Sequence, residues 1–191
     1  MRFVVVTVLV SGLAAPAFAQ TAASGQRSSQ PPSAASLLVR VAQNGWANEK
    51  RNIVESADQM PEANYGFKPV DGVRTFGQIL AHVADTNNFY CARSKGEPPP
   101  IPDGTLEKTA TTKAAIVKAL RDSVAYCDAV YAALTPATVA DMVTAGNNQI
   151  PRVQPLFTNI SHNVEHYGNL VTYFRMKNMV PPSTKRESGG L

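Results

Sequence analysis

The chain has 191 residues, 44% of them apolar and 17% charged, which supplies one folded core and excludes disorder throughout. Its formal net charge is +4, from 18 basic and 14 acidic residues, and no block of Lys and Arg concentrates this excess. Nucleic-acid-binding domains gather positive charge on one face, and the aromatic share of 7% is low for a base-stacking surface. We therefore expect no nucleic-acid partner.

The first residues are typical of a secretory signal peptide. A Met-Arg start precedes an apolar run over residues 3–13, and Ala17-Phe18-Ala19 places small residues where signal peptidase cuts. The alternative is a membrane anchor, but the run is shorter than the ~20 residues that cross a bilayer. The pattern predicts a signal peptide over residues 1–19, cleaved near Ala19, and a periplasmic or secreted protein without a stable membrane anchor.

A flexible leader rich in Ser, Gln, Ala and Pro is expected at residues 20–33, and a folded domain at 34–180. Within this domain, apolar residues recur at helical spacing in four stretches. These stretches run from about Ala35 to Met60, from Thr75 to Ser94, from Thr112 to Leu134 and from Pro151 to Met176. Four long helices in one small domain predict an all-α antiparallel four-helix bundle.

The signals between these stretches are weaker. Thr75 and Gln78 form a capping-box pattern at the start of the second helix, and Gly96 followed by prolines ends it. The stretch 137–150 has a looser pattern, and strand-like alternation is short and scarce. Residues 181–191 are expected to be a flexible tail.

Two cysteines, Cys91 and Cys127, lie in the domain. In an oxidising compartment an even count favours a disulfide, and the alternative is two buried free thiols. Their wide separation without a CxxC pattern does not suit a zinc site.

The chain has three histidines, at positions 82, 162 and 166. His162 and His166 lie four residues apart in the predicted last helix, so their rings share one side of it, together with Tyr173. That side flanks the apolar stripe, where either a groove or ordinary half-exposed histidines would lie. His82 lies two turns into the second helix and would complete a three-histidine set with open coordination positions, which is typical of catalytic metal sites. Imidazole ligands alone suit Zn, Ni, Cu or Fe(II).

Several segments resemble the DinB-like family, the damage-inducible DinB and YfiT-like group. They are YGFKP at 65–69, TFGQILAHVAD at 75–85, HNVEHYGNLVTYFR at 162–175 and VPPS at 180–183. The resemblance covers about residues 35–184. It implies a four-helix bundle with a long crossover connection, often a homodimer, and one divalent metal ion held by His82, His162 and His166.

The same resemblance bears on function, because family members include cytosolic thiol-dependent transferases and isomerases, and hydrolases. An export signal weakens the thiol-dependent alternative, since small thiols are scarce outside the cytosol. The sequence therefore favours an exported metal-dependent hydrolase that uses metal-bound water on an unspecified small-molecule substrate. The alternatives are a metal- or small-molecule-binding bundle without turnover, a thiol-dependent transferase, or a structural bundle with incidental histidines.

The sequence identifies no catalytic base. Glu165 lies between the two histidines of the last helix but points ~80–100° away from them. Asp85 lies one turn after His82 and would either orient an imidazole or serve as a solvated or capping carboxylate. Tyr173 would either line the pocket or only pack.

Overall fold

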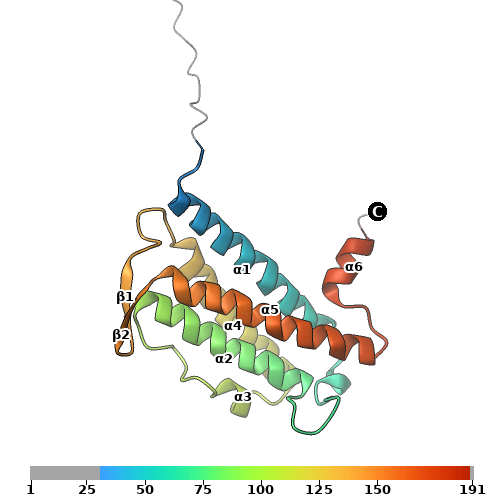
Figure 1. The fold of residues 1–191 in the computed structure, drawn as a ribbon. Coiled ribbons are helices and arrows are strands. Elements are labelled where there is room, and N and C mark those ends of the chain that lie inside the picture. The colour runs from blue at the N-terminus through green and yellow to red at the C-terminus, as the bar shows by residue number, and fades with distance from the viewer. Residues whose placement is uncertain (1–30, 190–191) are drawn as a thin grey trace, which may run out of the picture. The chain divides into compact units, whose positions relative to one another are not determined.

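Four long helices pack side by side in the computed structural model, which describes residues 31–189 (Figure 1). They are α1 (Ala34–Gln59), α2 (Phe76–Lys95), α4 (Lys113–Ala132) and α5 (Val153–Met176). The predicted four-helix bundle is therefore confirmed, with the helix ends close to the expected positions. The predicted signal peptide, and the leader as far as residue 30, lie outside the described residues.

Short elements occupy the connections of the bundle and the segment after α5. They are η1 (Glu62–Asn64), α3 (Leu106–Thr109), β1 (Met142–Ala145), β2 (Asn148–Pro151) and α6 (Pro182–Ser188). No helix among residues 31–189 combines the length and the hydropathy that crossing a bilayer requires.

The direction of the helices explains the predicted long crossover. α1 and α2 each pack against both α4 and α5. A disulfide joins Cys91 of α2 to Cys127 of α4, and a hydrogen bond joins Asn87 to Ser123. The earlier residue of α2 contacts the earlier residue of α4, so these two helices run parallel. The connection over residues 96–112 must therefore return along the length of the bundle, and it carries α3 along the side of α2 (Figure 1).

Local signals in the sequence set the ends of α2 as expected. The Thr75 hydroxyl accepts the Gln78 backbone N–H at 3.2 Å, and the Gln78 side-chain oxygen accepts the Thr75 N–H at 2.8 Å. This reciprocal pair is a capping box. Gly96 ends the helix with φ +72°, a left-handed conformation that glycine adopts without strain. These two caps fix where α2 begins and ends, and His82 lies about two turns after its start.

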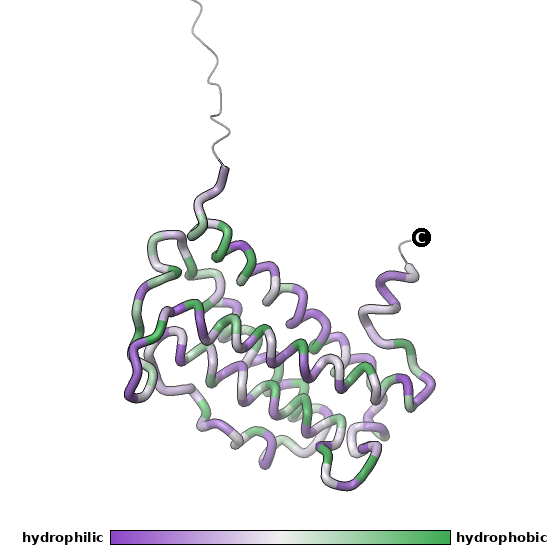
Figure 2. Tube along the Cα trace, in the orientation of Figure 1, coloured by the Kyte–Doolittle hydropathy of each residue, from purple (hydrophilic) through white to green (hydrophobic). Residues whose placement is uncertain are grey.

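Apolar and polar positions alternate along each long helix (Figure 2), and the buried ones form two clusters. One cluster contains Phe76, Leu80, Leu120, Leu170 and Phe174, and the other contains Trp46, Tyr131, Leu156 and the disulfide. Between them lies a buried polar layer. In it, Asn163 donates to Asn87 at 3.1 Å, and Asn87 donates to the Ser123 hydroxyl at 3.3 Å. This layer ties α2, α4 and α5 together directly beside the histidines.

Two parts of the chain differ from the sequence-based expectation. The looser stretch contains a β-hairpin in which β1 and β2 pair antiparallel around Gly146-Asn147, with Gly146 at φ +65°. A two-residue glycine-containing turn favours such a hairpin even where the flanking alternation is short.

The expected flexible tail at 181–191 instead contains the helix α6. Pro182 occupies the first turn of this helix, where its missing N–H is not needed. Arg186 forms an ion pair with Glu55 of α1 and donates to Asn52, and the Tyr167 hydroxyl donates to Ser183 at 2.8 Å. These contacts join segments far apart in the sequence, so composition alone did not reveal them.

The structure contains the disulfide that the two cysteines predicted, between the neighbouring helices α2 and α4 with their Cα atoms 5.5 Å apart. Cross-linking across 36 residues restricts the unfolded chain. Reduction should therefore lower the free energy of unfolding by about 3–4 kcal/mol. Denaturant unfolding of oxidised and reduced protein measures this difference. Two thiols that react in unfolded, unreduced protein would show that the bridge is absent.

Candidate metal centre

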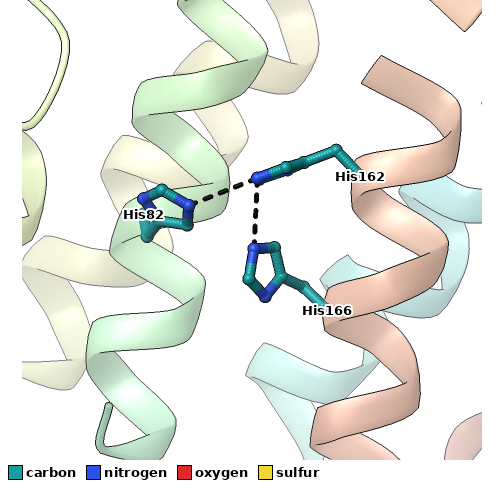
Figure 3. Close-up of side chains that lie close together, drawn as sticks. All are labelled: His82, His162 and His166. Carbon is teal, nitrogen blue, oxygen red and sulfur yellow. Dashed lines mark hydrogen bonds between the residues drawn. The ribbon is translucent and has the colours of Figure 1, made fainter. Parts of the chain in front are cut away.

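The three histidines come together between α2 and α5 (Figure 3). The Nε2 atom of His162 lies 3.3 Å from Nε2 of His82 and 3.1 Å from Nε2 of His166. One ring nitrogen from each residue lies within 4.8 Å of the other two. The residues that the sequence singled out as a ligand set therefore converge on one point, with one ring from α2 and two from α5.

The Nδ1 atom of His82 faces away from this point, toward two charged side chains. Glu107 of α3 places Oε2 3.4 Å from Nδ1, and Arg74 places Nη2 3.5 Å from it. Arg74 and Glu107 also pair with each other through contacts of 2.8 and 3.3 Å. His82 is therefore backed by an ion pair.

The other two rings also turn Nδ1 away from this point, toward a polar side chain. Nδ1 of His162 lies 3.3 Å from the Thr86 hydroxyl, and Nδ1 of His166 lies 3.5 Å from the side-chain nitrogen of Asn169. Each imidazole thus has a polar neighbour behind it and directs Nε2 inward. In metal sites such neighbours fix the tautomer and the orientation of a ligand ring.

Burial keeps these rings neutral. It is the largest cause that lowers the pKa of His82 and of His162 below the ordinary value. Burial also lowers the pKa of His166 to about 3, and the neighbouring rings of His162 and His82 add to this effect. Because a metal ligand must present an unprotonated nitrogen, three converging neutral imidazoles fit a divalent ion chemically. Both cysteines are engaged in the disulfide, so no thiolate joins this donor set.

Asp85 has a different role from the orienting one considered for it. Its fully buried carboxylate accepts the backbone N–H groups of Leu106 and Glu107, both at 2.9 Å. The structure therefore decides for the capping alternative, with Asp85 anchoring the start of α3. Glu107, the carboxylate nearest the His82 ring, was not anticipated, because only the course of the crossover brings it there.

Tyr173 fulfils both expectations considered for it. It is buried, and its hydroxyl donates to the Arg74 carbonyl at 2.6 Å. It also lines a cavity of about 440 Å³ beside His166. Other residues around this cavity are Pro69, Val73, Arg74, Ile79, Glu165 and Asn169. A small molecule could occupy this space within reach of the histidine cluster.

A larger cavity of about 650 Å³ lies between α3 and the start of α2, and none of the three histidines lines it.

Comparison with known proteins identifies relatives of the whole bundle. Residues 47–170 match the DinB superfamily. Among solved structures, a DinB-like protein from Bacillus cereus superposes with a TM-score of 0.63 at 14% identity, over 75% of this chain and 95% of that one. A DinB-like protein from Bacillus subtilis gives a TM-score of 0.58 at 14% identity, over 73% of this chain and 92% of that one. A mycothiol-dependent maleylpyruvate isomerase gives 0.57 at 14% identity, over 69% of this chain and 60% of its own. No curated protein matches the sequence.

The neutral histidines predict a specific pH dependence of stability in metal-free protein. Burial depresses the pKa of His166 in the folded protein to about 3. As pH falls below 6.5, the unfolded chain therefore binds a proton at this residue before the folded protein does. The stabilising contribution is full above pH 6.5 and is lost progressively toward pH 3. Between pH 7 and 5 the free energy of unfolding should fall by about 2 kcal/mol more in wild type than in His166→Gln. Urea unfolding in chelator at both pH values tests this, and equal slopes would contradict it.

Proposed function

The chain belongs to the DinB superfamily, and from this premise we propose that it binds one divalent metal ion through His82, His162 and His166 and acts as a metal-dependent hydrolase on a small molecule. The observation that carries the proposal is the convergence of three inward-facing Nε2 atoms from two helices. Three protein ligands leave coordination positions for water or substrate, which is the arrangement of catalytic rather than structural zinc sites.

A divalent ion at this point would supply a Lewis acid and a water whose pKa lies near 7. The chain's own residues supply the surroundings. The cavity beside His166 offers space for the substrate, with Ile79 and Val73 on its apolar side and Asn169 as a hydrogen-bonding group. Arg74 adds a positive charge, although Glu107 balances it in part.

The proposal extends to location. The signal-peptide pattern over residues 1–19 and the disulfide between α2 and α4 both suit an exported protein. Export also favours hydrolysis over thiol-dependent chemistry, because small thiols are scarce outside the cytosol.

A second candidate function is a thiol-dependent transfer or isomerisation. It is favoured by the similarity in fold to the mycothiol-dependent maleylpyruvate isomerase, at 14% identity. This similarity concerns the fold alone, so the two candidates must be separated by their requirement for a thiol.

Metal binding itself should depend on each histidine. Wild-type protein should bind one Zn²⁺ per chain, and His82→Ala should bind at least about 100-fold more weakly because one of three ligands is lost. Zinc should also raise the melting temperature by mass action, and chelator should reverse this. Glu165→Gln is the matched control, because Glu165 is an exposed residue between the two α5 ligands. Metal analysis and thermal unfolding give the readouts. Unchanged zinc affinity in His82→Ala would refute the three-histidine site.

Activity assays should then separate the two candidate reactions. Zinc-loaded protein is incubated with a panel of esters, amides and lactones, with and without mycothiol or glutathione. Hydrolysis without a thiol, abolished in His82→Ala, is the expected result. Turnover that appears only when a thiol is present would replace hydrolysis by the second candidate function. Export is tested separately by the N-terminal residue of protein recovered from the periplasm, where Gln20 is expected.

A further inference from the structure

We propose that Glu107 is a positioning residue of the histidine cluster, and that Asp85 holds it in place through the backbone of α3. This inference rests on the proposed metal function. Its structural basis is a chain of contacts from the buried carboxylate of Asp85, through the N–H groups of Leu106 and Glu107, to Nδ1 of His82.

The first link explains why Glu107 has a defined place. α3 spans only Leu106–Thr109, and such a short helix does not persist by itself in water. Asp85 is fully buried and accepts two backbone N–H groups from α3 at 2.9 Å, so it fixes the helix start against α2. Because Asp85 and His82 lie one turn apart on α2, the same helix carries both the ligand ring and the anchor of its neighbour.

The second link concerns the proton on His82. A carboxylate only accepts hydrogen bonds, so Glu107 Oε2, at 3.4 Å, favours a proton on Nδ1. The inward-facing Nε2 atom then keeps its lone pair. Arg74 lies 3.5 Å from the same Nδ1 atom and, as a donor, would favour the opposite tautomer. Its closer contacts, at 2.8 and 3.3 Å, are with Glu107, which engages the guanidinium.

His162 also has an acceptor at Nδ1, supplied by a different residue. The Thr86 hydroxyl donates its hydrogen to the carbonyl of His82 at 3.1 Å or of Val83 at 3.2 Å. Toward Nδ1 of His162, at 3.3 Å, this oxygen therefore acts as an acceptor. Two of the three rings thus face acceptors at Nδ1, the arrangement that would leave their Nε2 atoms free for a metal ion.

The first test uses metal-free protein and does not depend on activity. With ¹⁵N-labelled histidine at pH 7.5, NMR should show His82 with its proton on Nδ1 in wild type. Glu107→Ala should shift His82 toward the Nε2-protonated tautomer, because only the Arg74 donor remains. Asp103→Ala is the matched control, since it removes a nearby negative charge from the same crossover. A proton on Nε2 of His82 in wild type would overturn the proposal.

The second test measures zinc affinity by competition with a chelating dye. Glu107→Ala should bind zinc 10–100-fold more weakly, the range seen when a polar group that orients a ligand ring is changed. The zinc affinity of Asp103→Ala should stay within about threefold of wild type. This result would show that the loss of a nearby negative charge alone does not weaken binding. Glu107→Gln should recover part of the affinity, because its amide oxygen still accepts. Asp85→Asn should weaken binding in the same direction as Glu107→Ala, since the start of α3 is released.

The outcomes separate this inference from the metal site itself. If wild type binds zinc and Glu107→Ala binds it equally well while folded by circular dichroism, the positioning role is refuted and the metal site stands. If wild type binds no zinc, the proposed function fails, whereas the tautomer measurement still decides the role of Glu107. If Glu107→Ala does not fold, the comparison between Glu107→Gln and wild type decides the proposal by the same two readouts.

Discussion

The antiparallel packing of α2 against α5 is the constraint on which the centre depends. His82 on one helix meets His162 and His166 on the other with Nε2 atoms 3.1–3.3 Å apart. The capping box at Thr75 fixes the start of α2, and the buried hydrogen bond from Asn163 to Asn87 joins α5 to α2 beside the rings. A slip of one turn, about 5.4 Å, would separate the rings beyond any common ligand. Fold stability and the geometry of the histidine cluster therefore depend on the same interface.

The electrostatics of the cluster support the proposed cation. Burial lowers the pKa of each imidazole, most of all for His166, and so disfavours a positive charge on the rings. The Nε2 atoms of the three rings lie 3.1–3.3 Å apart in hydrogen-bonding contacts, and these are the nitrogen atoms that would face a positive centre between the rings. The proposed divalent ion would bind all three rings at once, and the polar groups behind His82 and His162 would stabilise the orientation it requires.

The crossover connection closes the bundle and also places a carboxylate beside the histidine cluster. Since α2 and α4 run parallel, residues 96–112 must travel the length of α2, and Asp85 binds the start of α3 on that path. This contact brings Glu107 behind His82. A bundle in which all neighbouring helices ran antiparallel would need only a short loop here and would have no such carboxylate beside the His82 ring.

The sequence alone determined the features that depend on local patterns. Helical periodicity located the four helices, the capping box located the start of α2, and the four-residue spacing put His162 and His166 on one side of α5. The cysteine count suggested the bridge between Cys91 and Cys127 that the structure contains. Short-range rules suffice for such features because each one acts within a few residues or on a simple count.

Only the tertiary structure decided the contacts between segments distant in sequence. It placed His82 within 3.3 Å of His162, turned Asp85 toward α3 instead of toward a ring, and brought Glu107 from the crossover to the centre. It also made α6 a helix through contacts of Arg186 and Ser183 with α1 and α5. Such pairings depend on how the chain returns along the bundle, and the free energy that selects them comes from burial across the whole core rather than from any local motif.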